Sequence, residues 1–148
     1  MNALFSNTTG SSNSAQGVNA LYSNTTGSYN SALGVNSGRY ISGGSVANQT
    51  SNNSLYLGYN AMALADGDTN EIVIGASAVG VGSNSVVLGN DSITKTILKG
   101  NVGIGTVSPT AQLTQQSTAV LESAPLGAEL LSSSGWTSTG WTGDWASG

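Results

Sequence analysis

The sequence predicts an all-β fold, a parallel β-solenoid in which short coils stack along one axis. Three observations predict it: a near-perfect tandem repeat, a recurring run of Asn, a few apolar residues and Gly, and glycines at a constant place after these runs. The repeat unit is too small for a helix pair or a propeller blade, but it suits one solenoid coil made of short strands and turns.

The repeat itself is the first observation. Ala3–Asn19 and Ala20–Asn36 are identical at fourteen of seventeen positions. A shorter signature then recurs, and its leading asparagines stand at positions 13, 30, 53, 70, 84 and 101. The steps from 13 to 30, from 53 to 70 and from 84 to 101 are equal, whereas the step from 30 to 53 is longer and that from 70 to 84 is shorter. This pattern indicates six coils of unequal length, which would form a rod of roughly 30 Å at the ~4.8 Å spacing of neighbouring strands.

The apolar runs have the composition of short strands. The segments 55–57, 72–74 and 86–88 consist of β-branched, aromatic or leucine side chains. A glycine follows each of them at the same offset, where a turn with positive φ requires it. These glycines are Gly58, Gly75 and Gly89. Asparagine also tolerates left-handed backbone, which explains its place at the predicted corners.

The same runs predict self-association. Alternate side chains of a strand point to opposite faces, so with Ile72 and Ile74 inside the coil, Val73 points outward. We expect an outward apolar column of Tyr56, Val73 and Val87. A thin coil buries such a column only against another chain. The column is therefore the predicted seam of a homotrimer of parallel rods, and a monomeric solenoid with an exposed stripe is the alternative.

The composition argues against several classes of function. Only 7% of the residues are charged, and three cations cannot form the basic stripe that nucleic-acid binding needs. The chain has no Cys and no His, which excludes disulfides, Cys/His zinc sites and His-dependent triads. No apolar run approaches the ~20 residues of a membrane-spanning helix. We expect no enzyme activity, no cofactor, no metal site, no nucleic-acid partner and no membrane span.

The acidic residues suggest two kinds of site, and we prefer a simpler interpretation of both. Residues 66–70 have the D-x-D-x-N opening of a calcium loop. The sixth and twelfth positions, however, are Glu71 and Ser77 in place of Gly and Glu. These acids and Asp91 also lack the flanking aromatic residues of a sugar-cleaving cleft. We interpret them as polar residues of solvated turns.

The pattern changes after residue 105. Ser108 and Pro109 have the residue types of a helix cap and first turn. Leu113, Val120 and Ala124 would then share one face of a short helix. An irregular neck or an extended strand is an equally good interpretation of this segment.

The chain therefore divides into three predicted parts. Residues 1–105 form the solenoid shaft, 106–129 a neck or linker, and 130–148 a Trp- and Gly-rich segment. The last part resembles the opening strands of a β-sandwich, of the jelly-roll type found at the ends of fibres, and it holds three tryptophans: Trp136, Trp141 and Trp145. So short a segment cannot build such a sandwich alone. We expect the tryptophans to pack between chains or to begin a further module.

The order of the motifs carries a further resemblance, over about residues 3–113. The run IVIGASAVGVGSNSVVLGN at 72–90 resembles the head repeats of trimeric autotransporter adhesins, which implies left-handed parallel β-rolls packed as trimers. With SNTTGSYNSALGVN before it and KGNVGIGTVSPTAQL after it, the whole resembles repeat regions of phage tail fibres and related bacterial surface proteins. We find no anchor barrel, long stalk or C-terminal chaperone, some of which such proteins normally carry, among the 148 residues, and the kind of fibre stays open.

The resemblance implies a structural role at a virion or cell surface. The expected function is the trimeric shaft of a phage tail or head fibre or of a bacterial surface filament. Its partners would be copies of itself and other fibre or virion proteins, and it would support attachment to a host. The alternative is a carbohydrate-binding receptor tip or adhesin that uses Trp136, Trp141 and Trp145 on host-surface glycans, since aromatic faces stack on sugars.

Overall fold

The computed structural model describes residues 2–115 of the 148-residue chain, and these contain strands and turns without a helix. The prediction of an all-β fold is confirmed for this part. The chain divides into two compact units, Met1–Ile97 and Leu98–Gly148, and each is described by itself. Within the described residues we find no helix that could span a membrane.

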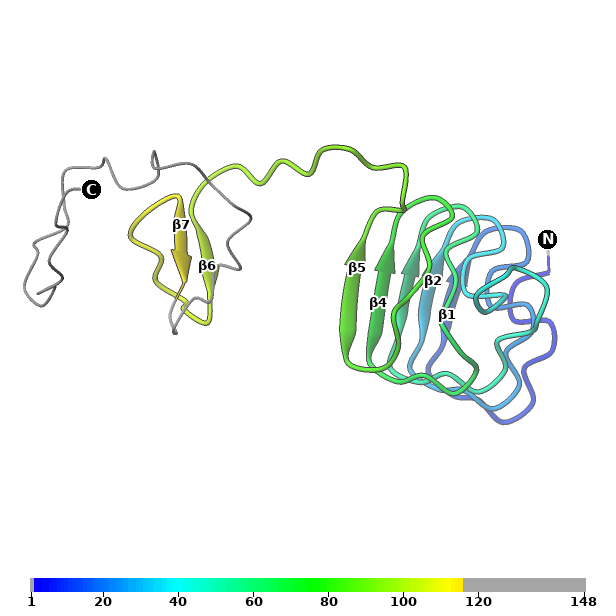
Figure 1. Cartoon of the computed structure of the whole chain (residues 1–148). Coiled ribbons are helices and arrows are strands. Elements are labelled where there is room, and N and C mark those ends of the chain that lie inside the picture. Colours follow the sequence, from blue (N-terminus) through cyan, green and yellow to red (C-terminus); the bar gives the residue numbers. More distant parts are fainter. Residues whose placement is uncertain (1, 116–148) are drawn as a thin grey trace, which may run out of the picture. The chain divides into compact units, whose positions relative to one another are not determined.

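Five short strands of the first unit form one parallel sheet in sequence order. They are β1 (Ser14–Gln16), β2 (Ser31–Leu33), β3 (Leu55–Leu57), β4 (Glu71–Ile74) and β5 (Ser85–Leu88). Consecutive strands that pair in parallel all begin at the same end of the sheet, so the chain has to cross back to that end after each strand. It does so by winding into a solenoid of about four turns, visible in Figure 1 as a stack of loops behind the strands. The predicted parallel β-solenoid is confirmed.

The strand register shows which positions of the coils are equivalent. Ser14 pairs with Ser31 and Ser31 with Leu55, and the later strands continue the series through Ile72 to Val86. The glycines that follow the strands keep the same offset from these residues in every coil: Gly17, Gly34, Gly58, Gly75 and Gly89. The leading asparagines do not, because Asn30 lies directly before Ser31 whereas Asn53 lies two places before Leu55. Glycine, and not asparagine, marks the equivalent positions.

The strand side chains point in directions opposite to those that we expected. Tyr56 and Val73, which we predicted to point outward, are 0% exposed and belong to the core. Val87 continues the same column, since it pairs with Val73. The predicted direction is wrong because the middle residue of each strand faces the interior. The sequence contains the signal in Ser14–Gln16, where the only apolar residue is the middle one, Ala15.

The side chains inside the solenoid complement one another in size, so that a large one packs against a small one. Tyr56 is the largest fully buried one. A Cβ on Gly38 would lie 2.7 Å from Tyr56 Cδ2 and 2.8 Å from Leu21 Cδ2. One repeat earlier, Leu21 stands where Gly38 stands, and Ala32 stands where Tyr56 stands. Large Tyr56 on the sheet thus goes with small Gly38, and small Ala32 on the sheet goes with large Leu21. This exchange keeps the interior close-packed.

A column of polar side chains lies inside the coils, directly before the strands; we call Asn13, Asn30 and Ser54 the inward ladder. Asn13 Oδ1 accepts a hydrogen bond from the Asn30 amide at 2.9 Å, and Asn30 Oδ1 accepts one from the Ser54 amide at 3.0 Å. Ser54 Oγ accepts from the Glu71 amide at 3.2 Å. Each member thereby pairs a backbone amide of the following coil, which burial would otherwise leave without an acceptor.

The glycines after the strands form a second column, where consecutive coils come close together. Gly58 has φ +133°. Gly75 and Gly89 have φ +142° and +93°, so the positive-φ turns predicted there are confirmed. A Cβ on Gly58 would lie 2.6 Å from the carbonyl oxygen of Gly75 in the next coil. Glycine is therefore needed both for the backbone conformation and for the distance between coils.

The second unit contains a short parallel pair, β6 (Val102–Ile104) and β7 (Leu113–Gln115). Residues 101–105, which we predicted to end the shaft, include β6, and β6 pairs with β7 in parallel. Two strands with exposed Ile104 and Leu113 bury little apolar surface on their own.

The helix that we considered after Ser108 is not present in the described part of this unit. Residues 108–112 contain bends, and β7 begins at Leu113, so the extended interpretation holds as far as Gln115. Val120 and Ala124, the rest of the proposed helical face, lie outside the described residues, as does the predicted boundary at 129/130.

The glycine column makes a stability prediction. We expect Gly58→Ala to destabilise the solenoid by about 3 kcal/mol or more, because backbone strain adds to a contact with the Gly75 carbonyl. Gly43→Ala is the matched control, since Gly43 also has positive φ (+91°) but a Cβ there meets nothing within 4 Å. Urea unfolding followed by circular dichroism measures both. Equal losses would contradict the close approach of the coils.

Candidate functional site

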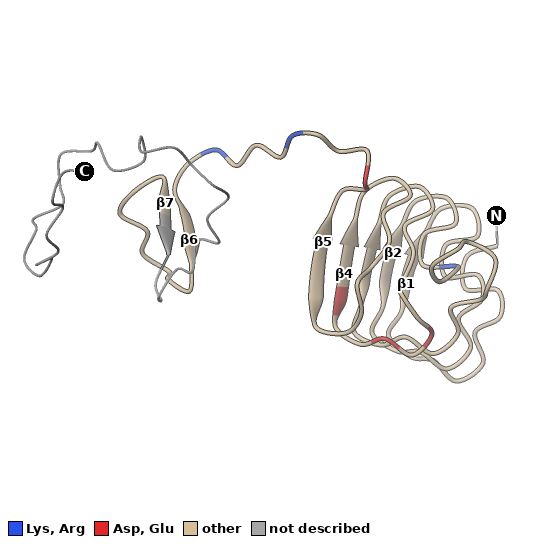
Figure 2. Ribbon diagram, in the orientation of Figure 1, with Lys and Arg blue, Asp and Glu red and all other residues tan. Residues whose placement is uncertain are grey.

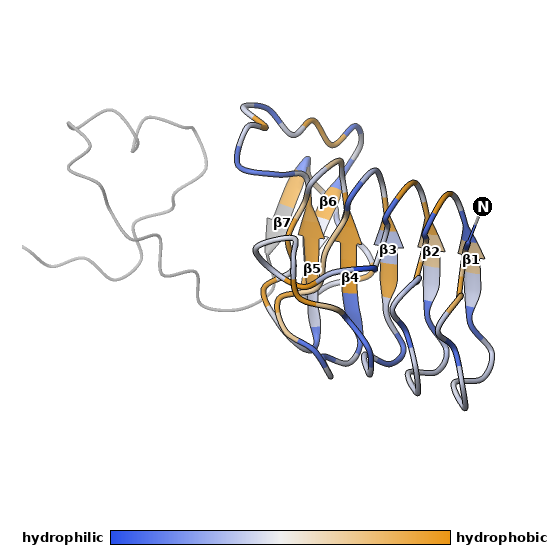
Figure 3. Ribbon diagram, turned by 90° about the vertical axis from the view of Figure 1, so that its right-hand side faces the viewer, coloured by the Kyte–Doolittle hydropathy of each residue, from blue (hydrophilic) through white to orange (hydrophobic). Residues whose placement is uncertain are grey.

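Two columns of outward side chains cover the sheet of the first unit; we call them the outer sheet face. The first column is Ser14, Ser31, Leu55, Ile72 and Val86, and the second is Gln16, Leu33, Leu57, Ile74 and Leu88. The face changes along the solenoid axis. To these columns β1 contributes only Ser and Gln, whereas β3, β4 and β5 contribute only Leu, Ile and Val. In Figure 3 much of β4 and β5 is orange, whereas β1 is pale.

The apolar part of the outer sheet face is open in the single chain. Val86 is 61% exposed and Leu88 is 55% exposed. Ile72 and Ile74, which we expected inside the coil, lie on this face and are half-buried. No charged residue stands in either column. Regular sheets with an uncharged apolar face usually have that face covered, which makes this surface a candidate contact site for another chain.

The same surface continues past the glycine column. Val18, Val35 and Tyr59 each follow the glycine of their coil and are exposed. The coils hold these positions in line, since the Asn36 amide donates to Val18 O and the Asn60 amide donates to Val35 O. The corner beside the outer sheet face is therefore also apolar over three coils.

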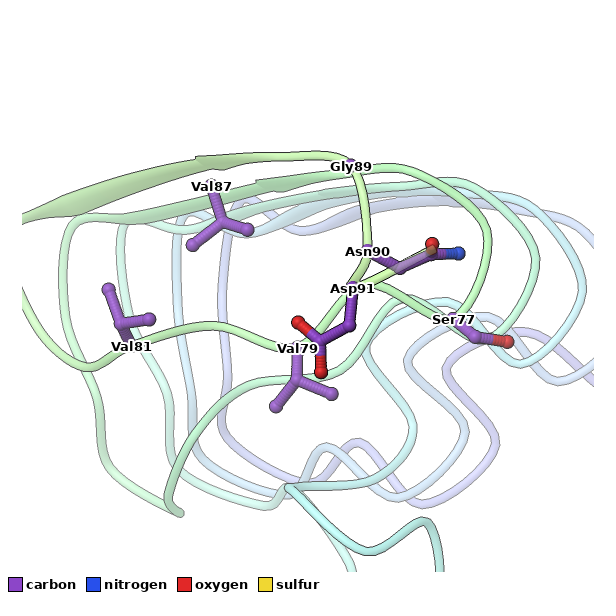
Figure 4. Close-up of a pocket in the computed structure, with 7 residues that line it drawn as sticks. All are labelled: Ser77, Val79, Val81, Val87, Gly89, Asn90 and Asp91. Atoms are coloured by element: carbon purple, nitrogen blue, oxygen red, sulfur yellow. The ribbon is translucent and has the colours of Figure 1, made fainter. Parts of the chain in front are cut away.

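Val87 has a different environment from the seam that we predicted for it. It is the last member of the interior column and lies beside a pocket of about 160 Å³ at the final coil (Figure 4). The pocket is lined by Ser77, Val79, Val81, Val87, Gly89, Asn90 and Asp91. β5 pairs only with β4 within the described residues, so the interior is uncovered at this end. The lining is about equally polar and apolar, and it includes the Asp91 carboxylate.

Asp66 and Asp68 have the turn role that we predicted. Asp66 Oδ1 accepts hydrogen bonds from the amides of Gln49 and Thr50 at 2.7 and 2.8 Å. Asp68 Oδ2 accepts one from the Ala65 amide at 2.8 Å. Both carboxylates thus pair backbone amides at the corners of the coils. Within the part of the chain that the structure describes, no three acidic side chains gather as metal ligands would.

Glu71 does not fit that interpretation. It begins β4, the strand that carries a red segment in Figure 2, and it is 0% exposed. Its Oε1 accepts a hydrogen bond from the Gly82 amide at 2.9 Å, but its buried Oε2 has no partner. Burial is the main cause that raises the pKa of this carboxyl above its usual value, and the nearby Asp68 charge adds to it. The hydrogen bond from Gly82 opposes the rise.

Sequence reasoning missed a stack of side chains on another side of the coils. Phe5 and Tyr22 occupy the same place in the two near-identical repeats, and their rings stack at 5.2 Å with 7° between their planes. The Arg39 guanidinium lies 4.7 Å from the centre of the Tyr22 ring. The signal was readable, because residues at the same place in consecutive repeats lie above one another in a solenoid.

Trp136, Trp141 and Trp145 lie outside the described residues. Their proposed contact with glycans or with neighbouring chains stays a prediction.

No protein-family model, no curated protein and no solved structure matches the chain. The class that the fold defines is a parallel β-solenoid repeat protein. What such a solenoid does has to be argued from its surfaces.

Glu71 makes a prediction about pH. The folded-state pKa is raised above the ordinary value of 4.5, so the folded chain holds this proton more tightly than the unfolded chain. The contribution of Glu71 to stability is therefore largest below pH 4.5, falls as the pH rises through the folded-state pKa, and is then constant. We expect Glu71→Gln to remove this slope and to raise stability at neutral pH by about 1 kcal/mol or more, because the amide carries no charge that has to be buried.

The measurement is urea unfolding of both proteins from acidic to neutral pH. Asp91→Asn, which neutralises an exposed carboxylate, is the control and should leave the slope unchanged. A Glu71→Gln protein with the slope of the wild type would show that another group causes it.

Proposed function

We propose that the chain is a structural fibre protein whose solenoid is the shaft of a homotrimer, in a phage tail or head fibre or in a bacterial surface filament. It would be exposed on a virion or cell surface and support attachment there. The observation that carries the proposal is the outer sheet face, which is apolar and uncharged from β3 to β5. The left-handed coil and the three-chain packing that the sequence resemblance implies belong to this proposal.

A thin coil cannot cover this face by itself. Its interior takes the middle residue of each strand, such as Tyr56 or Val73. The flanking residues, such as Leu57 and Ile74, point away from that interior. Removal of such side chains from water is favourable by roughly 25 cal/mol per Å². Contact with another chain would supply this stabilisation.

A second copy of the same chain suits the face better than an unrelated partner. Parallel rods of one sequence share the spacing of their coils, so their apolar coils meet apolar coils and their polar coils meet polar coils. The absence of charge in both columns means that close contact leaves no buried ion unpaired. Cyclic packing around one axis would also close the assembly, so that no apolar face is left over.

The alternative function, a carbohydrate-binding tip, depends on the three C-terminal tryptophans. These residues lie outside the described part of the chain, so the tryptophan-based tip stays a prediction.

Assembly tests the proposal. Leu88 and Gln16 stand in the same outward column, at the apolar and the polar end of the solenoid. We expect Leu88→Asp to weaken the trimer by several kcal/mol, because it places a charge in a desolvated contact. Since Leu88 is 55% exposed in the single chain, the coil itself should fold normally. Gln16→Asp, the matched control, should assemble like the wild type.

Native mass spectrometry and sedimentation velocity give the number of chains, and circular dichroism checks the fold. A wild-type protein that is monomeric at micromolar concentration would refute the proposal. Unchanged assembly of Leu88→Asp would show that the contact lies on another face.

A further inference from the structure

The coil between β2 and β3 contains an insertion that the neighbouring coils lack. The paired residues Ser31 and Leu55, at the starts of β2 and β3, are further apart in sequence than the equivalent pairs of the neighbouring coils. Those pairs are Ser14 and Ser31 before it, and Leu55 and Ile72 after it. The extra residues form a small hairpin: Tyr40 bridges Ala47 in the antiparallel sense, and the Ile41 amide donates to Val46 O at 3.0 Å. A Cβ on Gly43 at its tip would meet nothing within 4 Å, so the tip stands in solvent. Insertions into repeat proteins often form the binding face.

Arg39 stands at the base of this hairpin. Its carbonyl oxygen accepts a hydrogen bond from the Asn48 amide at 3.0 Å, which closes the insertion. Its guanidinium lies between two rings, 4.7 Å from the centre of Tyr22 and 4.6 Å from the centre of Tyr40. Phe5 of the first coil stacks on Tyr22 and is 67% exposed. One cation is thus fixed at the end of a column of aromatic rings.

The hydrogen-bonding groups of this cation are largely unused. Nη1 donates to Asn36 Oδ1 at 3.2 Å, which is the guanidinium's only hydrogen bond within residues 2–115. The buried Nε has no partner. Arg39 is also the only Lys or Arg before Lys95, the single blue segment on the solenoid in Figure 2. A cation held for its charge alone would be expected to pair with one of the solenoid's own carboxylates, and Arg39 does not.

Two amide side chains stand next to the guanidinium. Asn19 and Asn36 occupy equivalent places in consecutive coils, and Asn19 Nδ2 donates to Asn36 Oδ1 at 3.4 Å. Asn19 Oδ1 and Asn36 Nδ2 make no hydrogen bond within the described part of the chain. One acceptor and one donor therefore remain beside the Arg39 fork.

We propose that Arg39, the ring edges of Tyr22 and Phe5, and the amides of Asn19 and Asn36 form a binding site for an acidic oligosaccharide. Because Nε is buried, the fork that matches the two oxygens of a sugar carboxylate is the pair of terminal nitrogens, Nη1 and Nη2. The aromatic column offers apolar contact to the sugar rings, and the amides offer partners for their hydroxyls. From Phe5 to Arg39 the column spans two coil steps, ~10 Å at ~4.8 Å per step, which favours an oligosaccharide over a single sugar.

The chemistry favours a saccharide over an acidic peptide. The guanidinium can pair one carboxylate of either ligand, but the rings and amides beside it suit the apolar faces and hydroxyls of sugar rings, which a glutamate-rich peptide does not offer. The site lies on the single chain and uses none of the residues of the outer sheet face. The proposed binding site can therefore be tested independently of the proposed trimer.

A nuclear magnetic resonance titration tests the site on the full chain. Arg39 is the only arginine, so the single arginine Nε–H signal of the ¹⁵N-labelled protein belongs to it. We expect saturable shifts of this signal with a galacturonic acid trisaccharide and none with the neutral galactose trisaccharide at the same concentration. Arg39→Lys keeps the charge but loses the fork and should bind about tenfold more weakly or worse. Lys95→Gln should bind like the wild type.

Three results would overturn the proposal. The first is no shift with the acidic trisaccharide. The second is an equal shift with sodium sulfate, which would indicate an adventitious ion only. The third is an equal or larger shift with a glutamate-rich peptide. The binding of Arg39→Lys can also be followed through the amide signals of Asn19 and Asn36, and its circular dichroism shows whether the solenoid is intact.

Discussion

The buried amides at the start of β2, β3 and β4, those of Asn30, Ser54 and Glu71, set the main constraint on this solenoid. In every coil a residue with left-handed backbone stands at the same place in register before the strand, and it interrupts the regular strand ladder. These residues are Ser12, Tyr29, Asn53, Asn70 and Asn84. Where the next amide is buried, a side chain of the preceding coil pairs it: Asn13 for Asn30, then Asn30 for Ser54. Without this inward ladder each of these coils would bury a donor without an acceptor.

The ladder has consequences for the rest of the surface. Because Asn and Ser side chains occupy part of the interior, the apolar space inside each coil is small and takes only the middle residue of the strand. The other apolar residues of β3 to β5 stand on the outer sheet face. A small interior together with an apolar outer sheet face is why self-association is the function that we propose. At Glu71 the same column holds an acid, and there it leaves one oxygen unpaired.

Much of the fold could be predicted from local pattern, and the faces could not. The repeat, the short strands and the positive-φ glycines depend on residues close in sequence, so they were readable. The direction of Tyr56 and Val73 was not, because a strand that is apolar throughout does not show which face is inside. Glu71 was misread as a turn residue because burial depends on the neighbouring coils. The contact between the Arg39 guanidinium and the Tyr40 ring depends on the inserted hairpin, and no local sequence pattern predicts that hairpin.

Hydrogen exchange of backbone amides tests the central claim most directly. The amides of Asn30, Ser54 and Glu71 are bonded to side chains of the preceding coil and not to a strand. If the inward ladder holds the coils together, these three amides exchange as slowly as those of β2 to β4, because only unfolding of the stack exposes them. If they exchange as fast as the amide of Ser45 at the hairpin tip, the inward ladder is not what joins the coils.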